Sequence, residues 1–420
     1  MAKKAVKMEI ISKEIIKPSS PTPNHLKTFK LSLLDQLTLH SYTPILLLYN
    51  SQTPITTDDV FKKSLSETLK SYYPFAGRLQ QDGVTVDCND QGVVFIEAKL
   101  LGCKLSNFLL YPNFETQKLL FPEGFLWKGS CIDQSFLAAQ VTSFEGGGIA
   151  VTVSVSHKVA DGSTIAAFLH DWAATARGES RPKPIILATS IPSFDLTLAV
   201  PEIVMDKTAT CVTKRHVFDA RKILELKNSI DIAGSSKNPT KVELVTAHLY
   251  RCAIAASTAK TGRVRNSTWI QLVNMRPRMT SPLPENSVGN FSWYFTASNS
   301  VTQTSDLSNL VMELKKGIKD LCGGGDNCLE LGKWLIDVKE FASGVKMLFD
   351  DLDVYRCSSL CKKGFYEIDF GWGRPLWVAM ADVFVRNTFI LFDTEDGSGI
   401  EAMVSLEEDD MRLFSEAMNM

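Results

Sequence analysis

Alternating apolar and polar residues mark several short stretches in the first half of the chain, a period that is typical of β-strands. Residues 6–16, 44–49 and 85–88 follow this pattern, and the last of these stretches comes after a turn at Gly83. Residues 148–156 are apolar and largely β-branched, which predicts a further strand.

Helical spacing separates these predicted strands. Residues 58–73 place Val60, Phe61, Leu65 and Leu69 on one helical face, with Asp58 and Asp59 suited to a helix start and Pro74 to its end. Residues 163–176 form a second apolar helical face. Residues 157–162 therefore occupy a junction between a strand and a helix, where side chains are free of the packed faces on either side.

The second half of the chain repeats this mixture of helices and strands. We expect helices at 220–229, 241–257 and 307–321, a buried strand at 267–275, and strands at 292–297, 365–368, 376–380 and 387–393. Thr240 can cap the helix that begins at Lys241. The sequence therefore predicts an α/β fold.

The length of 420 residues predicts two domains, because a single hydrophobic core seldom grows so large. Residues 178–214 contain three proline-punctuated pieces without clear periodicity, which indicates a linker. We therefore expect an N-terminal domain at 1–185, a crossover linker at 186–214 and a C-terminal domain at 215–420.

Charge and composition narrow the classes of function. Lysine and arginine total 45 against 47 acidic residues, a formal charge of −2, so nucleic acid binding has no electrostatic basis. Residues 1–17 contain no apolar run long enough for a signal peptide or a membrane span. We expect a cytoplasmic protein that does not bind membranes.

Nine cysteines are dispersed along the chain without a CxxC pair or histidines at zinc-site spacing, which predicts reduced thiols and no metal centre. They are Cys88, Cys103, Cys131, Cys211, Cys252, Cys322, Cys328, Cys357 and Cys361. Two glycosylation sequons, at Asn266 and Asn290, are interpreted as accidental because nothing indicates secretion.

The strand-to-helix junction carries the first chemical motif, His157-Lys-Val-Ala-Asp161 followed by Gly162. Histidine can accept and return a proton near neutral pH, which makes His157 a candidate general base. The same spacing also fits a histidine that merely packs or caps at a strand end. It fits two metal ligands as well, but no third ligand lies nearby.

The second motif is Asp369-Phe-Gly-Trp-Gly373, roughly 200 residues after the first. Together the two motifs resemble the BAHD family of plant acyl-CoA-dependent acyltransferases. The resemblance extends along the whole chain through segments that match in order and spacing, at residues 17–23, 34–36, 73–78, 86–92 and 273–276.

This resemblance implies two chloramphenicol-acetyltransferase-like α/β domains, one with each motif, and a solvent tunnel between them with His157 at its centre. It implies an O-acyltransferase that moves an acetyl or other short acyl group to a hydroxyl of a small specialised metabolite, such as an alkaloid or terpenoid. Acetyl-CoA or another acyl-CoA is the expected co-substrate, no cofactor stays bound, and a monomer is expected. An amine acceptor is the alternative within this class.

The resemblance also implies roles for other residues. Asp161 should turn away from the imidazole and pair with Arg276, so that both, with Gly162, support the loop that aims His157. Asp369, Phe370, Gly371, Trp372 and Gly373 should form a structural loop.

Two further roles depend on less complete matches to the family. Ser358 and Ser359 are candidate donors to the oxyanion, although Leu360 stands where the family often has tryptophan. Thr240 and Lys241, at a predicted helix start, are candidate contacts to CoA.

Other classes of function are a thioesterase or ester hydrolase and a catalytically silent binding protein. The chain contains no Gly-x-Ser-x-Gly segment, which disfavours the common hydrolase architecture. An intact His157 disfavours the silent protein.

Overall fold

The structure is a computed structural model that describes residues 5–38, 40–51, 57–126, 133–186, 211–230, 238–279, 282–300, 306–322, 352–382 and 385–419. The chain forms two compact units. The first contains Met1–Thr197, Pro284–Phe291 and Lys363–Asp382, and the second contains Leu198–Leu283, Ser292–Lys362 and Val383–Met420. Each unit has a six-stranded sheet with helices, which confirms the predicted α/β class.

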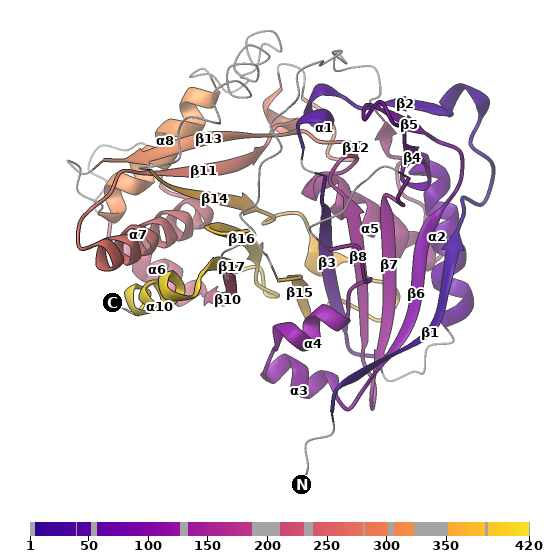
Figure 1. Ribbon diagram of the computed structural model, residues 1–420, viewed down its shortest axis with the longest axis horizontal. Helices are drawn as coiled ribbons and strands as arrows, with labels where there is room; N and C mark the ends of the chain where they lie inside the picture. The colour runs from indigo at the N-terminus through magenta and orange to yellow at the C-terminus, as the bar shows by residue number, and fades with distance from the viewer. Residues whose placement is uncertain are drawn as a thin grey trace. The chain divides into compact units, whose positions relative to one another are not determined.

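The sheet of the first unit joins strands that are far apart in sequence (Figure 1). Its order is β1 (Lys7–Ile16), β6 (Val93–Leu101), β7 (Leu137–Phe144), β8 (Ile149–Ser156), β3 (Tyr42–Tyr49) and β15 (Trp377–Met380). Every residue of β3 and β8 is buried. These two antiparallel strands therefore form the middle of a core, and β8 carries the chain directly to His157.

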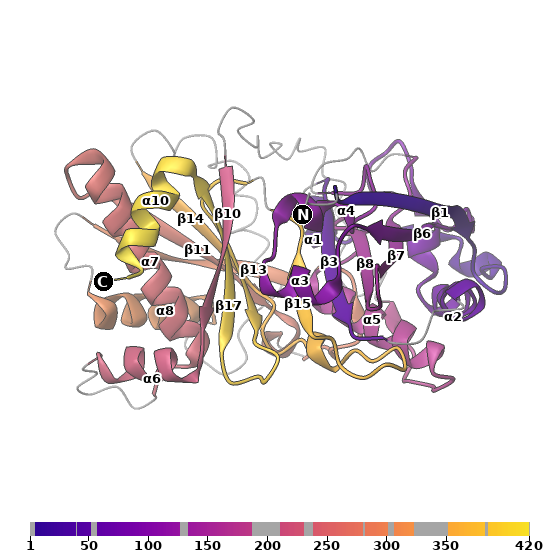
Figure 2. The same cartoon turned by 90° about the horizontal axis from the view of Figure 1, so that it is seen from below.

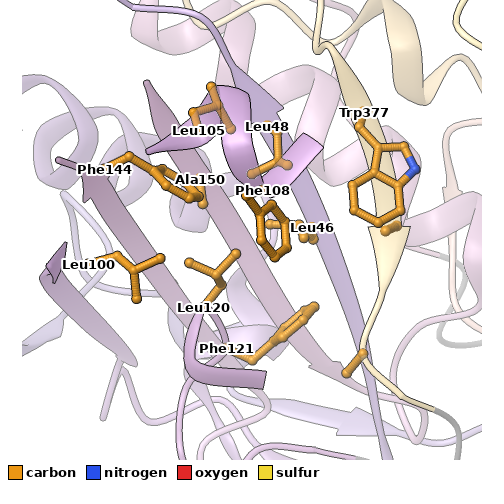
Figure 3. Packing of buried hydrophobic residues seen from close by; sticks show 12 residues of the cluster. Leu46, Leu48, Leu100, Leu105, Phe108, Leu120, Phe121, Phe144, Ala150 and Trp377 are labelled. Atoms are coloured by element: carbon orange, nitrogen blue, oxygen red, sulfur yellow. The ribbon is translucent and has the colours of Figure 1, made fainter. Parts of the chain in front are cut away.

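Helices cover the first sheet with apolar side chains. On one face, α2 (Thr57–Ser71) packs against α5 (Gly162–Ala176), with the rings of Phe61 and Trp172 5.7 Å apart. On the other, α3 (Leu105–Leu110) and the chain after α4 (Phe114–Leu119) add Phe108 and Leu120 to the cluster shown in Figure 3.

Several short elements complete the first unit. They are α1 (Leu33–Leu37), the small sheet of β2 (Thr28–Lys30), β4 (Arg78–Leu79) and β5 (Thr85–Asp87), the pair β9 (Ile185–Ile186) and β12 (Ser287–Val288), and the 3-10 helices Asn24–Leu26, Tyr73–Ala76 and Phe365–Glu367. The parallel pairing of β9 with β12 holds segment Pro284–Phe291 in this unit.

The second unit has a sheet with its helices packed on one face (Figure 2). The sheet order is β10 (Cys211–Phe218), β17 (Ile400–Glu407), β16 (Thr388–Asp393), β14 (Asp353–Ser359), β11 (Ser267–Asn274) and β13 (Ser292–Asn299). The helices are α6 (Ala220–Asn228), α7 (Lys241–Thr261), α8 (Leu307–Leu321) and α10 (Glu408–Ala417), with the 3-10 helix Arg276–Arg278 after β11. Ring contacts such as Tyr250 to Trp269, with centroids 5.3 Å apart, attach α7 to this face.

Two predicted strands differ from the structure. Residues 365–368 were expected to form a strand, which is wrong: Phe365–Glu367 is a 3-10 helix after Gly364, whose φ of 69° starts a turn. Both Phe365 and Tyr366 are buried, so the run has the hydrophobicity of a strand. The strand at 267–275 is buried only at alternate positions, because helices cover one face of its sheet.

The helix predicted at 58–73 begins at Thr57 and ends at Ser71, and the side chains of Asp58 and Asp59 lie outside the described residues. Cys131, Cys328 and most of the expected linker, residues 187–210, also lie outside them. In the parts of the chain that the structure covers, no helix is both long enough and apolar enough to span a membrane.

Candidate active site

His157 lies on the short loop that connects β8 to α5, as the hydrophobic pattern predicted. Its backbone N–H donates to the carbonyl oxygen of Ser41 over 2.8 Å. Its carbonyl oxygen accepts from Thr38 Oγ1 over 3.1 Å and from Asn290 Nδ2 over 2.7 Å. The backbone of this half-buried residue is therefore fixed on both sides before any substrate binds.

The ring of His157 has Asn290 as its partner, with His157 Nδ1 3.0 Å from Asn290 Oδ1. The amide nitrogen of Asn290 donates to Asp35 Oδ1 over 2.8 Å and to the His157 carbonyl over 2.7 Å, and neither oxygen can donate in return. This fixes the orientation of the amide, so its oxygen faces Nδ1 and can only accept. Nδ1 must then carry the hydrogen, and the lone pair of the neutral ring resides on Nε2.

Asp35 anchors Asn290 from behind. Asp35 Oδ1 accepts from both the backbone and the side-chain nitrogen of Asn290, each over 2.8 Å. Asp35 Oδ2 accepts from the backbone N–H and the hydroxyl of Ser32 over 2.9 and 2.6 Å. Burial raises the pKa of this carboxyl, while the hydrogen bonds from Ser32 and Asn290 act in the opposite direction. The result is a continuous series of contacts from Asp35 through Asn290 to His157.

The carboxylate of Asp161 accepts hydrogen bonds from two backbone N–H groups. One carboxylate oxygen accepts from the backbone of Thr164 over 2.9 Å, which caps α5 at its first residue, Gly162. The other accepts from the backbone of Phe291 over 3.0 Å. The buried Asp161 thus joins α5 to the segment that carries Asn290. Its pairing with Arg276, a buried residue of the second unit, stays a prediction.

The Asp369–Gly373 motif forms a tight loop within the first unit. Asp369 Oδ1 accepts from the backbone N–H groups of Gly371 and Gly373 over 2.6 and 2.9 Å. The two glycines have φ values of 108° and 87°, which side chains with a Cβ rarely adopt. The rings of Phe370 and Trp372 pack against Phe61, with centroids 5.3 and 5.4 Å away. This loop is therefore bound to the helix α2.

Ser358 and Ser359 lie at the end of β14, on opposite faces of the second sheet because strand residues alternate. Cys357 shares the helix-covered face with Phe389, its register partner, and Ser358 therefore points to the other face. The Ser359 hydroxyl accepts from the backbone of Cys361 over 3.4 Å. Of the two candidates, Ser358 is the one whose hydroxyl has no hydrogen bond to the described residues.

Thr240 and Lys241 start α7, and both make contacts within the second unit. The Thr240 hydroxyl accepts from the backbone of Glu243 over 3.2 Å, as the predicted cap. Lys241 Nζ donates to Asp393 Oδ1 over 3.0 Å and to the carbonyls of Gly397 and Gly399 over 2.7 and 3.3 Å. The ammonium group has only three hydrogens, so the contact to CoA that we predicted would compete with these acceptors.

Five other side chains that could act as a nucleophile or base, three cysteines and two histidines, are kept neutral by burial. The seven described cysteines are free of disulfides, and burial raises the pKa of Cys88, Cys252 and Cys361 to about 12 each. Burial lowers the pKa of His216 and His248 to about 4. These thiols and imidazoles are therefore neutral at physiological pH.

Asn290 and Asp35 were not predicted as site residues from the sequence. The sequence marks Asn290 only as a glycosylation sequon, yet its side chain is buried and hydrogen-bonded to His157. Asp35 stands out in the sequence only as part of a segment that matches the family. Asn290 and His157 are 133 residues apart in sequence, and no local pattern joins them.

Comparisons with known proteins identify the family of the chain. A family model described as "Transferase family" matches residues 6–420. Diaboline synthase from Strychnos sp is 40% identical, over 97% of this chain and 89% of that protein, and akuammiline synthase 1 from Alstonia scholaris is 39% identical, over 97% and 95%.

Solved structures also match. The crystal structure of vinorine synthase superposes with a TM-score of 0.84 at 33% identity, over 98% of each chain. The TRI101 structure from F. sporotrichioides, complexed with coenzyme A and T-2, has a TM-score of 0.72 at 16% identity, over 93% of this chain and 98% of that one, and shares the fold.

These matches cover nearly the whole length of the chain. The chain therefore belongs to the Transferase family of BAHD acyltransferases, which use an acyl-CoA as co-substrate. The resemblance predicted from the two motifs is confirmed.

Proposed function

We propose that this enzyme transfers an acetyl or other short acyl group from acyl-CoA to a hydroxyl of a plant specialised metabolite of the alkaloid or terpenoid class, with His157 as general base. The observation that supports this most is the contact of His157 Nδ1 with Asn290 Oδ1, which leaves a lone pair on Nε2. Relatives include vinorine synthase from Rauvolfia serpentina and a limonoid 21-O-acetyltransferase from Melia azedarach, each 35% identical.

The reaction follows from the chemistry of the neutral imidazole. Nε2 accepts the hydroxyl proton of the acceptor while the hydroxyl oxygen forms a bond to the thioester carbonyl carbon. The resulting tetrahedral oxyanion then expels the sulfur, the C–S bond breaks, and the imidazolium returns its proton to the CoA thiolate. In this proposal Ser358 donates a hydrogen bond to the oxyanion. The ester and free CoA leave, and no acyl-enzyme forms.

An amine acceptor is the second candidate. A relative from Strychnos nux-vomica, 38% identical to this chain, is named an N-malonyltransferase. An amine nucleophile also loses a proton when it attacks a thioester, so the same base would serve either acceptor.

Three further expectations belong to this proposal. The enzyme acts in the cytoplasm as a monomer, and Thr240 and Lys241 contact CoA. The functional domains have their boundaries at residues 185 and 215. The compact units divide the chain differently, because Pro284–Phe291 and Lys363–Asp382, which contains the Asp369–Gly373 loop, belong to the first unit.

A CoA-release assay tests the proposed function. With acetyl-CoA and a panel of alcohols and amines, we expect CoA release only when an acceptor is present, and mass spectrometry should identify an ester. His157→Ala should lower kcat roughly 10²–10⁴-fold. His25→Ala is a matched control on a 3-10 helix of the same unit and should leave kcat unchanged.

Two results would contradict the proposal. CoA release that needs no acceptor would favour a thioesterase. Full transfer activity in His157→Ala would rule out this histidine as the base.

A further inference from the structure

The face of the second sheet opposite its helices carries an arginine, Arg356 on β14. In register, it lies beside Ile270 of β11 and Thr388 of β16. Its neighbour in the chain, Tyr355, points to the other face, where its ring packs against Tyr250 of α7 with centroids 5.9 Å apart. Arg356 therefore shares its face with Ser358, two residues further along the strand.

The guanidinium of Arg356 has no partner in the described part of the chain, although the residue is half-buried. Other arginines of the same sheet region are paired: Arg215 makes two 2.6 Å bonds to Glu401, and Arg386 lies 2.9 Å from Glu407. Burial lowers the pKa of Arg356, as expected for a cation that has lost water without gaining an anion. Retaining such a group costs folding free energy, which indicates a functional reason for it.

Ser358 lies close to this cation. Two residues of a strand span about 7 Å, a distance that a long arginine side chain can cover. The Ser358 hydroxyl, like the guanidinium, has no hydrogen bond to the described residues. The same face thus carries an uncharged hydrogen-bond donor, the Ser358 hydroxyl, and the charged guanidinium of Arg356, whose N–H donors are all available to a ligand.

We propose that Arg356 binds a carboxylate of the substrate, in the first instance the free carboxylate of a malonyl-type acyl group. The proposal rests on the proposed function, in which Ser358 contacts the thioester oxygen. A malonyl carboxylate is one methylene away from that carbonyl. The phosphates of CoA are separated from it by the whole pantetheine arm and are too distant for a residue two positions from Ser358.

A planar guanidinium matches a carboxylate because two parallel N–H groups can donate to its two oxygens. An acetyl group offers no such acceptor. Arg356 would therefore make a carboxylated acyl-CoA a better donor than acetyl-CoA, which defines the donor class of the proposed reaction.

Binding measurements test this without any need for turnover. Calorimetric titration of the wild type with malonyl-CoA and acetyl-CoA should show malonyl-CoA binding about 10- to 100-fold more tightly. Arg356→Gln should lose this preference and bind acetyl-CoA as before, whereas Arg356→Lys should keep part of it. Arg412→Gln is the matched control, since Arg412 lies on α10 and its Nη1 is 2.9 Å from Oε1 of Glu416.

A second arm distinguishes the source of the carboxylate. With acetyl-CoA as donor, the transfer activities of the wild type and of Arg356→Gln are compared for acceptors supplied as free acids and as methyl esters. A loss of activity in Arg356→Gln that is confined to the free acids would assign the carboxylate to the acceptor. The proposal is overturned if Arg356→Gln changes binding and transfer equally with and without a carboxylate. Failure of the wild type to bind either thioester would overturn the proposed function as well.

Discussion

The loop after β8 and the end of β14 carry the two sets of polar groups to which we assign chemistry, and they differ in how those groups are satisfied. At the first, Asn290 uses its backbone and side-chain nitrogens and its amide oxygen in hydrogen bonds to Asp35 and His157. At the second, the guanidinium of Arg356 and the hydroxyl of Ser358 have no hydrogen-bond partner among the described residues. The hydrogen bonds of the first region form without substrate. The unpaired donors of the second region are those that we propose bind one.

This difference has a physical basis. A base must have its proton on the correct nitrogen before the reaction, and hydrogen bonds that already exist need no reorganisation during it. A group that recognises substrate must keep its donors available and therefore reduces the stability of the free protein. Substitutions in the two regions should consequently have opposite effects on stability.

The largest effect is expected from Asn290→Ala. Without the amide oxygen, both ring tautomers of His157 become accessible and the ring loses its fixed orientation. We expect kcat to fall roughly 100-fold, with a change in KM below about threefold, because Asn290 acts as a positioning residue. Steady-state kinetics with saturating acyl-CoA measure this.

Asn286→Ala is the matched control for this substitution. Asn286 lies four residues earlier in the same segment, and its side-chain nitrogen donates to the carbonyl oxygen of Lys183 over 2.8 Å. The kcat of Asn286→Ala should match that of the wild type. If the kcat of Asn290→Ala also equalled the wild-type value, Asn290 would not position the base.

Asp35→Asn should have the next largest effect, on stability. The buried carboxylate accepts from Ser32 and Asn290, and an amide cannot replace both acceptor oxygens. We expect a loss of about 2 kcal/mol in the free energy of unfolding. Because the folded pKa is raised above 3.8, the contribution of Asp35 is present at low pH and is lost as pH rises through the folded pKa. Urea titrations should therefore show a larger loss at pH 4.5 than at pH 8.

Asp396→Asn serves as the control for the pH dependence. Hydrogen bonds from Ser398 and Thr394 lower the pKa of this exposed carboxyl to about 2. Its contribution disappears only as pH falls through that value, so its effect should be equal at pH 4.5 and pH 8. A cost of Asp35→Asn that grew with pH would contradict a raised pKa for the Asp35 carboxyl.

Lys241→Met should have a smaller effect, about 1 kcal/mol of stability, through loss of the contacts to Asp393, Gly397 and Gly399. Because we propose that Lys241 also contacts CoA, the KM for acyl-CoA should rise roughly tenfold. A KM within about twofold of the wild type would contradict the contact to CoA.

Arg356→Gln should change stability least and in the opposite direction. Removal of a half-buried cation without a partner among the described residues should raise the free energy of unfolding by up to about 1 kcal/mol. Thermal unfolding in the absence of ligands measures this. A lower melting temperature would show that the guanidinium stabilises the free protein, and the contrast between the two regions would fail.

The periodicity of the sequence was sufficient to predict the junction that carries His157, because a long apolar strand and an amphipathic helix flank it. It failed at residues 365–368, where burial of Phe365 and Tyr366 in a 3-10 turn resembles a strand. The α/β class was predictable for the same reason as the junction, since both depend on local patterns.

The partner of His157 was not predictable in this way. Asn290 reaches the ring through the pairing of β9 with β12 and through the contact of Asp161 with Phe291. These are tertiary contacts between distant segments, and a single sequence records no signal for them. The prediction that the nearby Asp161 does not orient the ring came only from the family resemblance.

Nitrogen NMR of the imidazole tests the central claim most directly, namely that Asn290 holds His157 with its lone pair on Nε2. The protein, with its six histidines labelled with nitrogen-15, is measured at pH 8, and the His157 signals are assigned with His157→Ala. We predict a protonated Nδ1 and an unprotonated Nε2 in the wild type, and averaged signals in Asn290→Ala. A protonated Nε2 in the wild type would contradict the claim, because Nε2 would then have no lone pair to accept the proton of the acceptor.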